Sequence, residues 1–321
     1  MPSGRHMELQ KSLVQLGRKL GFLAEKEFPL VNLFPGYSPI IDVVWFYPLS
    51  EQQSHAIKKL YGLWPYWKDS RALYPYATFE ITASDATSKT VMSEIWNMKL
   101  AGFRYAFKIV PSKNPKHPDY MHKERAERIN RTLNYFSGTT DVFVLSLEDV
   151  ENAINTLTDI RINPRPKSPL SFKTPNLRDN LHNDITRKLA EFGKNKGFIS
   201  AVEYMPRWIK KLKERLTPIR TDAVWLLDLP SEVETGFSEF LELLGGLQTI
   251  KSTNPVEVLA FEVELGVFDK HSIGSVLNLA NIFGRGVVVV SHKDDKLVET
   301  IRLLSSNRVD VKGVNEMSLL F

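Results

Sequence analysis

The sequence predicts an α/β protein built from two similar domains, each with a central mixed β-sheet flanked by helices. Three observations predict this class. Helix-like and strand-like hydrophobic periodicities alternate along the 321 residues. Two short motifs, Asp-[Val/Ala]-Val-Trp and Phe-Glu-[Ile/Val], occur twice in the same order and at nearly the same spacing. A proline-rich stretch separates the two occurrences.

The first half alternates helix and strand signals. Leu9, Leu13 and Leu16 fall on one face of a helix expected at 8–20, and Gly21 ends it. Further helices are expected at 51–61, 88–101, 120–135 and 147–157, and strands at 22–30, 40–47, 77–82, 103–110 and 140–147. Turn residues, mostly proline and glycine, bound most of these segments.

The second half repeats this order after a linker. Residues 159–176 contain four prolines and no periodicity, which is typical of a linker. Helices are then expected at 177–196, 207–215, 234–245, 271–283 and 294–306, and strands at 198–205, 220–229, 258–265, 286–291 and 309–319. A period this long indicates a duplicated domain, so we expect domains at 7–158 and 177–321.

Composition sets the broad class. Hydrophobic residues make up 43% and charged residues 25%, which is ordinary for a globular protein. The absence of cysteine excludes disulfides and thiolate metal sites, and no signal peptide or membrane-length apolar run is present, so we expect a cytoplasmic protein without a membrane partner. Residues 1–6 resemble an added leader, so we expect the natural chain to start at Met7 and the fold to begin there.

The second copy of the repeat carries three carboxylates on neighbouring strands. Asp222 opens one expected strand, and Glu262 and Glu264 lie two positions apart on the next, so these glutamates share a face. A Glu-x-Glu strand is more often a solvated sheet face, but the same strand order with Asp42 and Glu80 in the first copy favours a site. Such hard oxygen ligands select Mg²⁺ or Mn²⁺ over zinc.

A divalent ion on these carboxylates could activate a water to attack phosphorus. With this chemistry, each half resembles the PD-(D/E)xK nuclease superfamily, which has the restriction-endonuclease-like fold. The matching positions are Asp222, Glu262 and Glu264; the departure is Glu264, which stands where the family usually has lysine. The resemblance implies that Asp222, Glu262 and the Val263 carbonyl bind the metal and that Glu264 orients or deprotonates the water.

The family often adds an upstream acidic residue, for which Glu203 and Asp184 are both candidates. Lys270 could supply the missing positive charge and contact nucleic acid, although a solvated lysine is the commoner role for such a residue.

The first copy departs further from the family pattern. Asp42 and Glu80 are kept, but Thr82 replaces the third residue and can serve neither as a carboxylate ligand nor as an ammonium group. Asp85, or a lysine at 89 or 99, could compensate. We expect this copy to be degenerate and to serve in DNA binding or packing.

Basic and aromatic residues mark where nucleic acid could bind. The net charge of +5 suits a polyanionic partner. A basic segment precedes the Asp222 strand and comprises Arg207, Lys210, Lys211, Lys213 and Arg215. In the first copy, Trp64, Tyr66 and Trp67 beside lysines could stack bases or, alternatively, cover the core.

The sequence therefore predicts a Mg²⁺- or Mn²⁺-dependent endonuclease that acts on DNA, with RNA not excluded, and has its active site in the C-terminal copy. The alternatives are a catalytically inactive nucleic-acid-binding scaffold and a branched-DNA resolvase. The duplicated fold also allows a homodimer.

Overall fold

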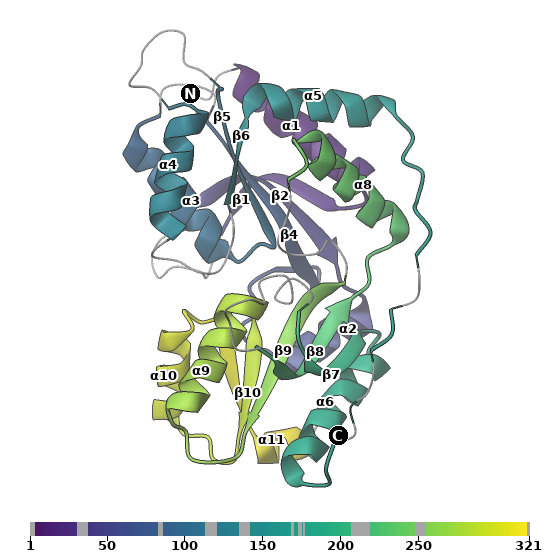
Figure 1. Ribbon diagram of the computed structural model, residues 1–321, viewed down its shortest axis with the longest axis vertical. Coiled ribbons are helices and arrows are strands. Elements are labelled where there is room, and N and C mark those ends of the chain that lie inside the picture. The colour runs from purple at the N-terminus through teal and green to yellow at the C-terminus, as the bar shows by residue number, and fades with distance from the viewer. Residues whose placement is uncertain are drawn as a thin grey trace. The chain divides into compact units, whose positions relative to one another are not determined.

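The structure, a computed structural model, describes residues 4–30, 38–82, 86–112, 121–134, 142–167, 170–172, 175, 177–206, 219–247 and 255–319. Contacts divide the chain into two compact units (Figure 1). Unit 1 comprises Met1–Pro48, Leu73–Pro166 and Pro230–Gln248, and unit 2 comprises Leu49–Ala72, Lys167–Leu229 and Thr249–Phe321. Each unit has a mixed sheet flanked by helices, as the sequence predicts. In the described part of the chain, no helix is both long and apolar enough to cross a membrane.

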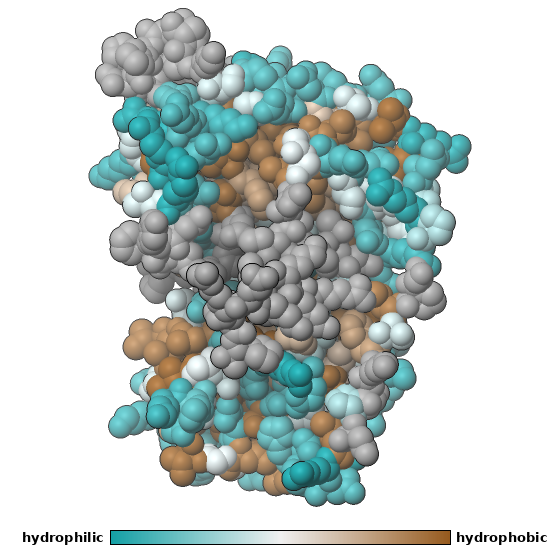
Figure 2. All heavy atoms as spheres, in the orientation of Figure 1, coloured by the Kyte–Doolittle hydropathy of each residue, from teal (hydrophilic) through white to brown (hydrophobic). Residues whose placement is uncertain are grey.

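The sheet of unit 1 has the order β1-β2-β4-β5-β6. Its strands are β1 (Leu23–Pro29), β2 (Ile40–Pro48), β4 (Arg71–Ile81), β5 (Tyr105–Val110) and β6 (Val142–Ser146). The first three strands pair antiparallel and the last three pair parallel. The helices are α1 (Gly4–Lys19), α3 (Ser88–Ala101), α4 (Lys123–Asn134), α5 (Leu147–Asp159) and α8 (Ser231–Leu243). Hydrophilic side chains cover the outward sides of α4 and α5 (Figure 2).

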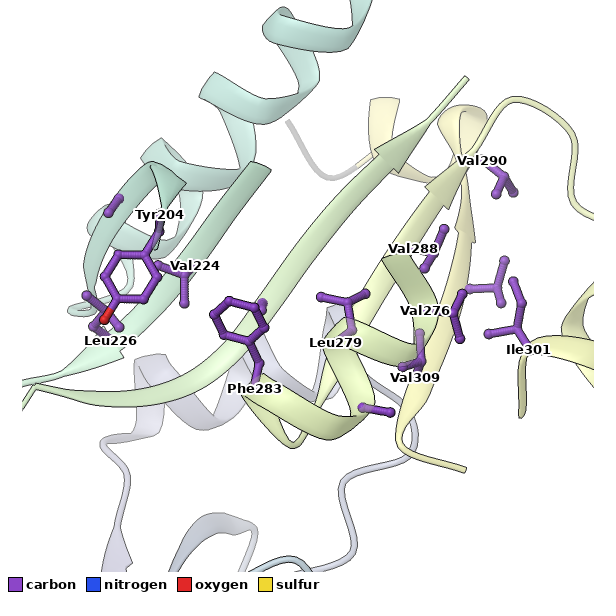
Figure 3. Close-up of a cluster of buried hydrophobic side chains, with 14 residues drawn as sticks. Tyr204, Val224, Leu226, Val276, Leu279, Phe283, Val288, Val290, Ile301 and Val309 are labelled. Atoms are coloured by element: carbon purple, nitrogen blue, oxygen red, sulfur yellow. The ribbon is translucent and has the colours of Figure 1, made fainter. Parts of the chain in front are cut away.

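The sheet of unit 2 repeats this topology with the order β7-β8-β9-β10-β11. Its strands are β7 (Ile199–Tyr204), β8 (Thr221–Leu227), β9 (Val256–Glu264), β10 (Gly286–Val290) and β11 (Val309–Gly313). Its helices are α2 (Glu51–Leu60), α6 (Leu181–Asn195), α9 (Lys270–Asn278), which continues as the π-helix η1 (Leu279–Phe283), α10 (Asp295–Leu304) and α11 (Val314–Ser318). Apolar side chains from the strands and from α9, η1 and α10 form one core cluster (Figure 3).

The tryptophan of each Asp-[Val/Ala]-Val-Trp motif has a structural role, because it packs a helix against the sheet. Trp45 and Trp225 are fully buried, and each indole Nε1 donates to a helix carbonyl, that of Leu13 at 3.1 Å and of Leu189 at 2.9 Å. A Cβ at Gly17 would collide with the Trp45 indole, and a Cβ at Gly193 would collide with the Trp225 indole. The register of the sheet also shifts just after each tryptophan. The two copies therefore share helix packing as well as strand order.

Each unit takes one helix from the other half of the sequence. In unit 1, Phe237 and Phe240 of α8 are fully buried against the aromatic core, and Phe237 lies 4.8 Å from Tyr76 between ring centroids. In unit 2, Gln53 of α2 donates to the Gly197 carbonyl at 2.8 Å. The units thus differ from the contiguous segments 7–158 and 177–321, although unit 1's longest segment ends in the proline-rich stretch.

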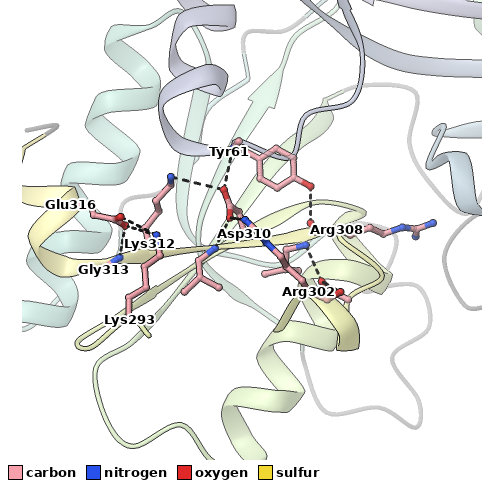
Figure 4. A network of polar contacts seen from close by, with 12 residues as sticks. Tyr61, Lys293, Arg302, Arg308, Asp310, Lys312, Gly313 and Glu316 are labelled. Carbon is pink, nitrogen blue, oxygen red and sulfur yellow. Dashed lines mark hydrogen bonds and ion pairs between the residues drawn. The ribbon is translucent and has the colours of Figure 1, made fainter. Parts of the chain in front are cut away.

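A polar network fixes the residues that follow α2 in unit 2 (Figure 4). The Tyr61 hydroxyl donates to the Arg308 carbonyl at 2.9 Å, and the Gly62 amide donates to Asp310 at 3.0 Å. Arg302 also lies 3.4 Å from Asp310. These contacts anchor α2 to β11 by main-chain groups and one buried carboxylate.

Several predicted elements are corrected. The last strand does not extend over 309–319, because Gly313 ends β11 and its amide donates to Glu316 at 2.8 Å, which starts α11. Strand β4 starts at Arg71 and not at 77, because a turn with positive φ at Asp69 and Ser70 pairs it with β3 (Trp67–Lys68). Helix α1 starts at Gly4, inside the supposed leader. The segment 207–215 lies outside the described residues.

Candidate functional site

Each sheet places an aspartate opposite a glutamate. The antiparallel pairing of β2 with β4 sets Asp42 across from Glu80. The pairing of β8 with β9 sets Asp222 across from Glu262 in the same way. Side chains directly opposite on one sheet face lie close enough to interact, and like charges there are destabilising. Each copy therefore holds a carboxylate pair that needs a proton or a cation.

The main chain fixes both aspartates identically. Asp42 Oδ2 accepts the Ile81 amide at 2.7 Å, and Asp222 Oδ2 accepts the Val263 amide at 2.7 Å. Both donors are the residue that follows the paired glutamate. The Asp carboxylate is thus aimed along the partner strand, which keeps it beside the glutamate.

Both glutamates hold their protons tightly. Burial, followed by the charges of Asp222 and Glu264, raises the pKa of Glu262 to about 9. Burial and then the Asp42 charge raise the pKa of Glu80 well above its usual value. A divalent cation between such carboxylates would replace the shared proton.

A histidine, which the sequence reasoning missed, reaches the aspartate in each copy. His6 Nε2 lies 3.2 Å from Asp42 Oδ1, and His182 Nε2 lies 3.3 Å from Asp222 Oδ2. The hydrogen bond with Asp222 raises the pKa of His182 to about 9. His6 precedes Gly17 of α1 by the same number of residues as His182 precedes Gly193 of α6, and these are the two glycines that pack on the tryptophan rings. This shared spacing is the sequence signal for the two histidines. Excluding residues 1–6 concealed it.

A third acidic residue lies on the neighbouring strand beside each pair. Glu27 and Glu203 lie opposite the two aspartates and have φ values of 51° and 50°, in the left-handed region that residues other than glycine rarely adopt. The charge of Glu203 raises the pKa of both Glu262 and His182. Asp184, the other upstream candidate, pairs with Lys188 at 3.1 Å. The left-handed backbone conformation that recurs at Glu27 and Glu203 is strained, and strain of this kind is typical of functional sites.

The first copy has a buried lysine beside its carboxylate pair. In the parallel register of β4 and β5, Lys108 lies next to Glu80 and is fully buried. Its Nζ is 2.6 Å from Glu94 of α3 and 2.7 Å from the Thr82 hydroxyl. The ammonium group absent from position 82 therefore comes from the neighbouring strand. Sequence spacing could not reveal it, because Lys108 is remote from the motif along the chain.

The second copy has a different arrangement. The residue beside Glu262 on β10 is Val288. Glu264 accepts hydrogen bonds from Ser272 at 3.2 Å and Ser275 at 2.8 Å, both on α9. Lys270 is the exposed first residue of α9. The third carboxylate of this copy is thus occupied by the protein's own hydroxyls.

A cavity of about 640 Å³ opens beside the first copy's pair. Its walls include His6, Gln10, Asp42 and Glu80. Lys89 also lines it, whereas Lys99 is buried and Asp85 lies outside the described residues. A volume of this size is typical of small-molecule and cofactor sites.

The donor chemistry fits a weakly caged divalent ion. Among the described residues, no group of three or more His, Asp or Glu side chains is arranged to hold a metal ion. Mg²⁺ needs only one or two carboxylates, and it keeps several waters or takes substrate phosphate oxygens. The pairs Asp42–Glu80 and Asp222–Glu262 meet that requirement.

The predicted nucleic-acid contacts have mixed outcomes. Arg207, Lys210, Lys211, Lys213 and Arg215 lie outside the described residues. Trp64 and Tyr66 are buried, and Arg285 stacks on both rings, at 5.0 and 5.9 Å from their centroids. Those two rings therefore belong to the core of unit 2, while Trp67 remains 38% exposed.

Comparisons with known protein families, with curated proteins and with solved structures give no match to this chain.

Proposed function

We propose that the chain is a cytoplasmic, divalent-metal-dependent phosphodiester hydrolase that acts on DNA, with two domains of the PD-(D/E)xK type. One observation carries the proposal: the opposed Asp–Glu pair occurs twice, with the same main-chain clamp on the aspartate. A Mg²⁺ or Mn²⁺ ion held by such a pair would bind a phosphate oxygen and lower the pKa of a water.

We place catalysis in the N-terminal copy, in contrast to the sequence-based expectation of the C-terminal copy. Only the first copy combines the pair with a buried lysine in register beside its glutamate, among the residues that the structure describes. Lys108 Nζ would stabilise negative charge that develops on the phosphate as water oxygen bonds to phosphorus and the P–O bond to the leaving group breaks. The cavity gives a substrate access to Asp42 and Glu80, and Lys108 is buried beside that pair.

The chain's own residues have distinct roles in this scheme. The Ile81 amide and the His6 and Gln10 side chains hold the two oxygens of Asp42 in one orientation. Glu94 forms an ion pair with the Lys108 ammonium at 2.6 Å, and the Thr82 hydroxyl accepts a hydrogen bond from it at 2.7 Å, so both fix its position. The attacking water gives its proton to bulk solvent, and the leaving oxygen takes a proton from bulk solvent.

Matched substitutions in the two copies test this proposal. Cleavage of single-stranded, duplex, flap and junction DNA, and of single-stranded RNA, is measured with Mg²⁺ or Mn²⁺ for the parent, Asp42→Asn and Asp222→Asn. We expect Asp42→Asn to lose at least about 100-fold in rate and Asp222→Asn to stay near the parent. The opposite result moves catalysis to the C-terminal copy. Equal cleavage by all three proteins, or none, rejects the hydrolase; retained DNA binding without cleavage favours the scaffold.

A further inference from the structure

One wall of the N-terminal cavity is a polar face of α3. Lys89, Ser93 and Asn97 follow one another at intervals of four residues, so they share one side of the helix, and all three line the cavity. Val91 and Ile95 of the same helix are fully buried and pack toward the core. The cavity-facing side thus presents an ammonium, a hydroxyl and an amide, which are the donors that proteins use on nucleic-acid phosphates. The Glu94 carboxylate on the same wall is paired with Lys108.

The second copy has a different partner for the residue at the position of Ser93. Helices α3 and α9 follow corresponding strands, and the helical segments that they begin both end at a left-handed glycine, Gly102 and Gly284. Counted from these glycines, Ser275 takes the place of Ser93. The Ser275 hydroxyl donates a hydrogen bond to Glu264 at 2.8 Å.

In the first copy, residue 82 leaves α3 open toward the cavity. Thr82, which replaces Glu264, contacts Lys108 at 2.7 Å and Glu94 at 3.5 Å. Ser93 and Asn97 face the cavity that holds Asp42 and Glu80. The replacement of one glutamate by threonine therefore exposes a row of donors beside the carboxylate pair.

We propose that Lys89, Ser93 and Asn97 bind the phosphodiester backbone of a single nucleic-acid strand that lies in this cavity. The inference rests on the proposed hydrolase, since it takes the phosphate next to Asp42 as the reacting one. The cavity of about 640 Å³ has the volume of a small-molecule site, which matches one nucleotide of a strand more closely than a duplex. The substrate class is therefore a single strand or the unpaired end of a branched DNA.

The test separates binding from cleavage. Fluorescence anisotropy with Ca²⁺ in place of Mg²⁺ measures the Kd of a labelled single strand and of the matching duplex. The variants are Ser93→Ala/Asn97→Ala and Lys89→Ala. The matched controls are Asn152→Ala/Thr156→Ala, an exposed amide and hydroxyl with the same spacing on α5, and Lys11→Ala on α1. Thermal unfolding confirms that every variant is folded.

We expect the α3 double variant to weaken single-strand binding about tenfold, Lys89→Ala about threefold, and both controls to match the parent. We also expect single strands to bind more tightly than the duplex. Parent-like binding by the α3 variants, or preference for the duplex, overturns the inference; the hydrolase stands if Asp42→Asn still abolishes cleavage. If the parent binds single strands through α3 and does not cleave any substrate, the proposed hydrolase is wrong and the proposed binding by α3 is supported.

Discussion

The two copies keep the same four polar residues and use their third motif position in opposite ways. Histidine, a left-handed glutamate, aspartate and the paired glutamate recur in both sites. Beyond them, Thr82 accompanies a buried lysine and an open cavity, whereas Glu264 is bonded to two serines. Glu264 thus looks more catalytic than Thr82 in the sequence, but its carboxylate is already hydrogen-bonded within the protein.

The cores of the two units differ as well. The exchanged helix α8 brings aromatic residues to unit 1, where they stack among the rings of the sheet. The exchanged helix α2 carries Ile57 and Leu60 at the corresponding positions of the repeat, and both are fully buried. The same topology therefore tolerates either aromatic or aliphatic side chains on the exchanged helix, while the polar site residues stay constant.

The largest expected effect tests the exchange of helices. Phe237→Ala removes a fully buried ring from unit 1, so we expect a loss of about 3–5 kcal/mol in the free energy of unfolding. Ile57→Ala, its counterpart in unit 2, should cost about 2–5 kcal/mol. Hydrogen exchange then shows which strands lose protection. Loss in β7–β11 for Phe237→Ala would contradict the assignment of α8 to unit 1.

The next effect tests the asymmetry of the two sites. Lys108→Met keeps the length of the side chain and removes its charge, so we expect cleavage to fall by about 100- to 1000-fold. Val288→Met at the matching position of the second copy should leave the rate close to that of the parent. Both rates are measured at saturating single-stranded DNA. A Lys108→Met enzyme with parent-like kcat would remove the reason for placing catalysis in the first copy.

A third effect concerns the proton held in the second copy. The pKa of Glu262 is raised to about 9, so the folded state keeps a proton that the unfolded chain loses near its usual value of 4.5. The metal-free protein should therefore lose stability as pH rises from about 4.5 to about 9. Glu262→Gln cannot ionise, and each pKa unit of this shift is worth roughly 1.4 kcal/mol.

Urea unfolding with EDTA at pH 5 and pH 8 measures this dependence. We expect Glu262→Gln to be more stable than the parent at pH 8 and to have the flatter pH profile. The control is Glu299→Gln, an exposed carboxylate of the same unit. Parallel profiles for the parent and Glu262→Gln would show that the pair does not share a proton.

The sequence revealed the parts of the site that lie within single motifs. Strand periodicity and the repeat were sufficient to place Asp42, Glu80, Asp222 and Glu262 on adjacent strands, because alternation fixes the face of each residue. Lys108 and the histidines come from other elements, and only the sheet register and helix packing bring them close. The exchange of α2 and α8 was also hidden, because an amphipathic pattern shows which face is buried but not which sheet buries it.

The smallest expected effect separates the two histidines. In the first copy, His6 and Gln10 both contact Asp42 Oδ1, at 3.2 and 2.9 Å, so either can hold the carboxylate. In the second copy, the position of Gln10 is taken by Thr186, whose hydroxyl donates to the His182 carbonyl. His6→Phe should therefore lower kcat only about fivefold, the cost of one hydrogen bond, without changing KM. His6→Gln, which retains an N–H donor, should restore most of the rate, whereas His6→Phe/Gln10→Leu should lose far more than either single change. Equal rates for His6→Phe and His6→Gln would mean that the ring, and not its hydrogen bond, positions Asp42.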